Sequence, residues 1–324
     1  MRPVGGLHRA RLRWARLLMV GLGAALLCGG CGSGNANFVW GRTPALTPDG
    51  KTLYFCQNLS SPTDRLTTTV SVLDTGWIFT ANADGTNAVQ LTPRGLGPDF
   101  FPTVSPDGTR LAFISLSNKE FDVWISALDG TARQQVTYDL AVETMPHWRP
   151  NGAQIVFVSS RSGNANIWLI NSDGTGLQPV TATASDQAGP AYSPDGTQIA
   201  YVTNQDRSNW DLWVMNADGS NQRQLTRKND SNSTISDGGP AWSPDGKTIA
   251  FERWTGTWNV YTISAGSTTN NPVQLTNGTK WHSGEPTFTP DGTAIDYTSS
   301  ESGWWQIWQM KPDGTLQHQL TGQH

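Results

Sequence analysis

Five acidic side chains stand just ahead of a recurring turn sequence, where together they could attract positive charge. Asp99, Glu143, Asp186, Asp237 and Glu285 each precede, by one to four residues, a proline that opens a Pro-x-x-x-Pro-[Asp/Asn]-Gly segment. If these segments are equivalent in the fold, the five carboxylates lie on one rim and attract cations or a basic peptide segment. Alternatively, each carboxylate accepts hydrogen bonds from backbone amides of its own loop. The sequence leaves both interpretations open.

Aromatic residues occur in the same loops. Trp281, His282 and Trp304 stand where a strand pattern does not require them, whereas Trp258 and Trp305 are expected to fold down between structural units. Exposed aromatic side chains are typical of protein contacts and of sugar stacking. We therefore place Trp281, His282 and Trp304 with the five acids in one candidate binding rim.

The sequence does not match the known motifs for catalysis, metal binding or cofactor binding that its residues suggest at first. The Asp-Gly turns do not match a calcium loop, because apolar or neutral residues such as Ile125 and Leu169 occupy the first ligand position. Gly50-Lys-Thr52 looks like the end of a phosphate-binding loop, but Ala45 stands at its first glycine. Outside the two ends of the chain only His147 and His282 remain, too few for a histidine-based metal centre. We predict no catalytic residue, no metal ligand and no cofactor.

The elements that position the rim come from a sixfold repeat. Its copies are Pro44–Gly50, Pro102–Gly108, Pro146–Gly152, Pro190–Gly196, Pro240–Gly246 and Pro286–Gly292. Their glycines are 58, 44, 44, 50 and 46 residues apart. A period of this size indicates one supersecondary unit repeated, each copy burying its neighbour's apolar face.

Each copy carries four short strand signals. The third strand has an aliphatic–aromatic pair, as in Val123-Trp124 and Ile167-Trp168, and the fourth ends in threonine, as in Val136-Thr137. A single four-stranded sheet cannot cover its own apolar faces, but sheets arranged radially cover the faces of their neighbours. The sequence predicts an all-β fold, a six-bladed β-propeller of four-stranded antiparallel blades, over residues 41–324. The two turns of each blade should share one face, and the variable connections the other, where function is expected.

The N-terminus has a different composition. Residues 1–30 combine five arginines with the apolar run Leu17–Cys28, typical of a secretory signal, although an uncleaved anchor remains the alternative. The end of the run resembles the lipobox of bacterial lipoproteins, with Cys31 as the residue that would be acylated. Residues 31–40 then form a short linker. Without residues 1–30 the chain has 17 basic and 26 acidic side chains, which disfavours nucleic-acid binding.

The repeat as a whole resembles that of the TolB-like propellers. It shares their Pro-Asp-Gly turn, aromatic third strand, Asp-Gly turn and closing Leu-Thr, and acids before the repeat proline match Asp99, Glu143 and Asp237. The resemblance implies an exported six-bladed propeller that holds protein partners or extended peptide segments at its loops and channel mouth. Three departures stand out: no α/β domain precedes the propeller, no hydrolase domain lies beside it, and the metal-binding histidines of propeller lyases are missing.

The sequence therefore favours a non-catalytic protein-binding scaffold in the bacterial cell envelope, periplasmic or at the outer surface. We expect a monomer that contacts the membrane only through a lipid on Cys31. Carbohydrate recognition, or lyase or hydrolase action on polysaccharide, is the alternative.

Overall fold

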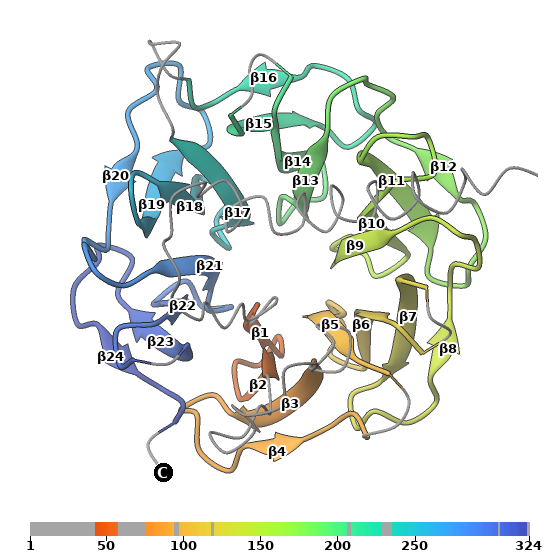
Figure 1. Ribbon diagram of the computed structural model, residues 1–324, viewed down its shortest axis with the longest axis horizontal. Helices are drawn as coiled ribbons and strands as arrows, with labels where there is room; N and C mark the ends of the chain where they lie inside the picture. The colour runs from red at the N-terminus through yellow and green to blue at the C-terminus, as the bar shows by residue number, and fades with distance from the viewer. Residues whose placement is uncertain are drawn as a thin grey trace, which may run out of the picture.

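The propeller prediction is confirmed. The computed structural model describes residues 43–57, 76–93, 97–117, 120–205, 209–227, 235–303 and 305–322. Within them, six four-stranded sheets each consist of consecutive antiparallel strands. The sheets stand around a central axis with their first strands innermost (Figure 1). The signal segment, the linker and Cys31 lie outside the described residues, as does Trp304.

The strand bounds repeat closely from blade to blade. Blade 1 contains β1 (Ala45–Leu46), β2 (Thr52–Gln57), β3 (Trp77–Asn82) and β4 (Val89–Gln90). Blade 2 contains β5 (Asp99–Val104), β6 (Arg110–Ser115), β7 (Asp122–Ala127) and β8 (Gln134–Gln135). Blade 3 contains β9 (Glu143–Trp148), β10 (Gln154–Ser159), β11 (Asn166–Asn171) and β12 (Gln178–Pro179). Blade 4 contains β13 (Gln187–Tyr192), β14 (Gln198–Thr203), β15 (Asp211–Asn216) and β16 (Arg223–Gln224). Blade 5 contains β17 (Ser236–Trp242), β18 (Thr248–Trp254), β19 (Trp258–Ser264) and β20 (Val273–Gln274). Blade 6 contains β21 (Ser283–Phe288), β22 (Ile295–Ser299), β23 (Gln306–Met310) and β24 (His318–Gln319).

The repeated turn between the first two strands is held by its own side chains. In blade 4, Ser193 Oγ donates to Asp195 Oδ1 at 2.6 Å, and the amide of Thr197 donates to the same oxygen at 3.0 Å. Gly196 completes the turn at a φ of +68°, which favours glycine. The copy with Asn151 keeps this bond, because its Oδ1 accepts from the Ala153 amide at 3.0 Å. The turn aspartates therefore have a structural role.

The closing threonine of each blade forms a hydrogen bond to the third strand of the same blade. Its Oγ1 accepts a hydrogen bond from the amide of the aliphatic residue on the third strand, at 2.8 to 3.0 Å in the six blades. In blade 2 the pair is Thr137 and Val123. The outermost strand is only two residues long, so this side-chain bond extends its pairing with the third strand.

Neighbouring blades pack through the aromatic residue of the second strand. Phe113, Phe157, Tyr201, Phe251 and Tyr297 are at most 1% exposed. Burying each such side chain stabilises the fold by roughly 2 to 3 kcal/mol. Within the described ranges no helix is long and apolar enough to cross a membrane.

The loops of the propeller divide between two faces. We call the face with the turns between strands one and two, and three and four, the hairpin face. The opposite face carries the connections between strands two and three and between blades, and we call it the loop face. This arrangement follows from the consecutive antiparallel order of the strands in each sheet.

Candidate binding site on the loop face

A ring of five residues surrounds the central axis. In blades 2 to 6 the innermost strand has a β-bulge, visible as a register shift against the second strand. The residue before the repeat proline has a φ between +48° and +58° in these blades. We call these residues the central ring: Phe101, Met145, Gly189, Gly239 and Glu285. A bulge re-aims a side chain and bends its strand, so the fold brings five unlike residues together at equivalent positions.

Contacts across blade boundaries hold the central ring together. The amide of Gly189 lies 3.1 Å from Met145 Sδ, and a Cβ on Gly239 would lie 3.7 Å from the Cα of Glu285. The sequence contains one sign of this ring, because glycine, which tolerates a positive φ, stands before the repeat proline in two of the five blades. The sequence analysis above did not identify these positions.

Glu285 belongs to a pair of acidic residues at the ring. Its amide donates to Glu252 Oε2 at 3.1 Å. Glu252 stands on β18 where other blades have residues such as Ile114 and Val158, and burial raises the pKa of its carboxyl to about 7. Gly238 and Gly284 make room for it, since a Cβ on either would lie within 2.7 Å of a Glu252 oxygen. Glu252 therefore adds a second carboxyl that the sequence interpretation did not single out.

Three of the expected rim acids instead face the interior of their own blades. Asp99, Glu143 and Asp237 stand three residues before the repeat proline and are at most 4% exposed. Asp99 receives two hydrogen bonds of 2.9 Å from Arg133, and Asp237 receives bonds of 2.6 and 2.8 Å from Arg253. Glu143 is paired with Arg161.

The arginines of these pairs lie over aromatic rings of the same blade. Arg161 Cζ is 4.8 Å from the ring centroid of Trp168 and 5.9 Å from that of Phe157. Arg133 and Arg253 lie similarly over the aromatic residues of their second and third strands. Burial raises the pKa of Glu143 to about 7, while Thr137 and Arg161 oppose this shift. These contacts are made with arginine side chains and not with backbone amides of the same loop, so they match neither interpretation, and they favour a structural role in each blade.

Asp186 lies one residue out of register with the three paired acids. Gln187 occupies the equivalent position in blade 4, where it is buried and contacts Thr181. Asp186 is partly exposed, and its Oδ1 accepts from the Ala165 amide at 3.0 Å. The donor is a backbone amide, but it lies in the connection between β10 and β11 and not in the loop of Asp186 itself.

Of the three candidate aromatic residues, His282 lies in a stack of rings between blades 5 and 6, together with Trp254 and with Trp305, which had been expected to fold down between blades. The ring of His282 is 5.8 Å from that of Trp254 and 6.2 Å from that of Trp305, with interplanar angles of 22° and 12°. Its Nδ1 accepts from the Trp258 amide at 3.2 Å. We call Trp254, His282 and Trp305 the aromatic stack. All three are partly exposed, as is the neighbouring Trp281, whereas Trp258 is buried.

A second apolar feature of the loop face was missed by the sequence interpretation. Tyr138 is 74% exposed and Leu140 is 83% exposed, on the connection between blades 2 and 3. Asp139, between them, forms a 2.9 Å ion pair with Arg161, so that connection is tied to the buried Arg161–Glu143 pair. The signal was a pair of apolar residues in a loop directly after the closing threonine.

His147 does not belong to the rim. It lies in β9, where its Nδ1 accepts from the Tyr192 amide of the next blade at 3.4 Å. Burial lowers its pKa to about 4. Across the described ranges, no group of three histidine, cysteine, aspartate or glutamate residues is arranged to hold a metal ion.

Several solved structures align with this chain. TolB from Acinetobacter baumannii aligns with a TM-score of 0.68 and 19% identity over 86% of this chain, and this chain spans only 65% of that protein. A putative TolB from Agrobacterium tumefaciens aligns with a TM-score of 0.59 and 21% identity over 72% of this chain and 84% of that one. Oligogalacturonate lyase from Vibrio parahaemolyticus aligns with a TM-score of 0.55 and 16% identity, over 86% of this chain and 77% of that one.

These likenesses show a shared fold. A comparison with curated proteins finds no match. Residues 75–239, just over half of the chain, match the model of the TolB beta propeller domain family. The match runs from the last two strands of blade 1 to the start of blade 5. This range contains the repeat, the closing threonine and two of the three buried ion pairs. The chain belongs to the TolB beta propeller domain family.

Proposed function

We propose that this propeller is an exported, non-catalytic binding scaffold of the bacterial cell envelope that holds a partner protein on its loop face. Acylation of Cys31 would anchor it to the membrane. The observation that carries the proposal is the exposed pair Tyr138 and Leu140, which leaves apolar surface in water on the face that varies between blades. The aromatic stack offers further partly exposed apolar surface on the same face.

The central ring gives the partner an axial contact. Phe101 and Met145 supply apolar side chains, and Glu252 with Glu285 supplies acidic ones. An extended segment that carries a basic residue among apolar ones fits this combination. Asp99, Glu143 and Asp237 are buried and paired with arginines, whereas Glu252 and Glu285 are partly exposed at the central ring, so we assign the acidic contact to these two.

The test compares the two faces of the propeller. The protein carrying Tyr138→Ser and Leu140→Ser is used to capture partners from an envelope extract of the host bacterium. We expect at least a tenfold loss of the retained partner, because exposed aromatic and aliphatic anchors dominate binding energy. The matched control is Leu177→Ser with Leu316→Ser, which removes exposed leucines from the hairpin face. Equal losses in both variants, or none in either, would exclude the loop face as the docking surface.

Carbohydrate binding is the second candidate, and the aromatic stack is the observation that favours it. Partly exposed Trp281 lies beside the stack in sequence, and such rings can stack on sugars. A glycan array separates the two functions. Binding of one sugar class that Trp281→Ala abolishes would establish carbohydrate recognition, whereas an array with no bound glycan would leave the protein-binding proposal in place.

A further inference from the structure

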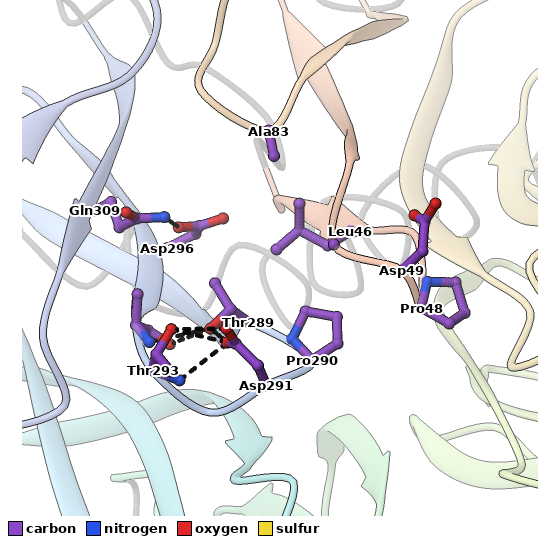
Figure 2. Close-up of a pocket in the computed structure, with 12 residues that line it drawn as sticks. Leu46, Pro48, Asp49, Ala83, Thr289, Pro290, Asp291, Thr293, Asp296 and Gln309 are labelled. Atoms are coloured by element: carbon purple, nitrogen blue, oxygen red, sulfur yellow. Dashed lines mark hydrogen bonds between the residues drawn. The ribbon is translucent and has the colours of Figure 1, made fainter.

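The hairpin face contains a cavity at the boundary between blades 6 and 1. Its volume is about 440 Å³, within the usual range for sites that bind small molecules or single side chains. Figure 2 shows Leu46 on one side of the cavity, with Asp296 and Gln309 of blade 6 across from it. It lies on the opposite face from the loop-face site, so it is independent of the function proposed above.

One contact of the repeat is missing at this cavity. In four blades the glycine of the turn between strands one and two packs on the turn proline of the preceding blade, whereas a Cβ on Gly152 would meet only Arg110 Nη2, at 3.9 Å. A Cβ on Gly108 would lie 3.3 Å from Pro48, and one on Gly292 would lie 3.6 Å from Pro244. The same holds for Gly196 on Pro150 and for Gly246 on Pro194. At Gly50, which should meet blade 6, a Cβ would find nothing within 4 Å.

Blade 6 also places unusual residues at this boundary. Asp296 on β22 pairs across the sheet with Gln309 on β23. The equivalent pairs elsewhere are mostly apolar: Ala112 with Ile125, Val156 with Leu169, and Ala200 with Val214. Asp296 is thus an acid at a position where the other blades have small or apolar residues. Such departures from the pattern of a repeat tend to mark functional positions.

The Asp296 carboxylate is only half satisfied. Oδ1 accepts from Gln309 Nε2 at 2.8 Å. Oδ2 has no hydrogen-bond partner among the described residues, although the side chain is 0% exposed. In Figure 2 this second oxygen points away from Gln309, toward the side of the cavity where Leu46 lies. A buried carboxylate oxygen without a donor costs free energy unless a ligand supplies one.

The rest of the lining indicates the chemistry of that ligand. Leu46, Ala83 and Pro290 provide apolar walls. The turn acids Asp49 and Asp291 stand at the cavity, but each already accepts hydrogen bonds within its own turn. His318 on β24 pairs across the sheet with Gln309 and lies outside the cavity lining. The described lining contains no lysine or arginine. An aliphatic stem with a cationic head fits such a site.

We propose that this cavity binds an organic cation, an alkylammonium or guanidinium group, whose N–H donates to Asp296 Oδ2. Its stem packs on Leu46 and the turn prolines. A metal ion is a poorer fit, since the described acids do not converge as a ligand set. The cation comes either from a basic side chain of a polypeptide or from a free amine.

The experiment titrates the whole chain with matched probes at pH 8 and follows backbone amide shifts by NMR. N-acetyl-arginine amide is compared with N-acetyl-citrulline amide, which has nearly the same shape without the charge. We expect saturable shifts at Gly292, Thr293 and Ala294 with the arginine probe, and at least tenfold weaker binding of the citrulline probe. An arginine-containing pentapeptide and 1,4-diaminobutane, run side by side, identify the source of the cation by which of them binds more tightly.

Two variants complete the test. Asp296→Ala introduces the residue that Ala112, Ala200 and Ala250 already place at this position, so the blade should still form. Asp296→Asn keeps the shape and removes the charge. Both should weaken arginine-probe binding by about ten- to a hundredfold. The proposal is overturned if the wild-type protein shows no saturable binding, if citrulline binds as well as arginine, or if both variants retain the wild-type affinity.

Discussion

At the scale of single residues, the most informative side chains are acids that stand where the repeat expects apolar ones. Asp296 and Glu252 are such residues, each on the second strand of its blade and each with a carboxyl whose pKa burial raises, to about 6 and about 7. Among the residues that the structure describes, neither forms an ion pair with an arginine, unlike Asp99, Glu143 and Asp237. The other blades form without an acid at these positions. We therefore assign Glu252 to the proposed loop-face site and Asp296 to the proposed cation site.

The difference in stability between the wild-type protein and Asp296→Ala should depend on pH. The folded-state pKa of Asp296 lies near 6 and its ordinary value is 3.8, so between these values the folded protein binds the proton more tightly than the unfolded chain. The contribution of Asp296 to the free energy of unfolding therefore falls as pH rises from about 4 to about 6.

Asp296→Ala removes this dependence. It should be more stable than the wild type by on the order of 2 kcal/mol above pH 6.5, with the difference shrinking toward pH 4. Urea unfolding at pH 4, 5, 6 and 7.5 measures it. A difference that is constant across this range would show that burial does not raise the pKa of the Asp296 carboxyl in the folded protein.

At the scale of the element, the blade is organised around its first and second strands. The carboxylate of the first strand meets an arginine that lies over the aromatic rings of the second and third strands, in blades 2, 3 and 5. The arginine reaches this place from β18 in blade 5, from a loop in blade 3 and from beside β8 in blade 2. The interaction is thus common to these blades although the arginine's place in the sequence varies.

Removing one partner of such a pair should be costly. Asp237→Asn leaves the Arg253 guanidinium buried without its counter-ion, and we expect a loss of about 3 kcal/mol in the free energy of unfolding. Asp186→Asn is the matched control, because Asp186 is partly exposed and an asparagine oxygen can still accept from Ala165. It should change stability by about 0.5 kcal/mol or less. Chemical denaturation compares the two, and similar small effects would mean that the pair contributes little to the blade.

At the scale of the whole molecule, the circle of six blades is closed by a contact that recurs between neighbouring blades. The glycine of the second turn packs on the last strand of the preceding blade. A Cβ on Gly219 would lie 2.2 Å from Val180 O, and one on Gly85 would lie 2.0 Å from Leu320 O. The second contact joins blade 1 to blade 6, so the first and last blades meet in the same way as the others on this side. The missing turn contact at Gly50 opens the cavity at the same boundary.

Closure can be tested with two glycines of similar backbone conformation. Gly50 has a φ of +68° and Gly85 a φ of +80°, so alanine at either position costs roughly 1 to 2 kcal/mol in backbone strain. Only Gly85→Ala also collides with the neighbouring blade, which should add about 1 to 3 kcal/mol. Thermal and urea unfolding of both variants would measure the difference. Equal destabilisation would show that the Gly85–Leu320 contact does not limit stability.

The amino-acid sequence by itself determined the number of blades, their four strands and the turn chemistry. These depend on short-range patterns: Asp195 and Gly196 form their turn from neighbouring residues, and Thr137 bonds a strand only 14 residues away. Which acids face solvent was decided only by the tertiary structure. Asp237 stands three residues before its proline and Glu285 one residue before. Only the β-bulge in the first strand, which depends on pairing with the second strand, decides that the first of these positions is buried and that the second lies at the central ring. The cavity at Asp296 arises where two particular blades meet, because packing between segments far apart in the sequence depends on both surfaces at once.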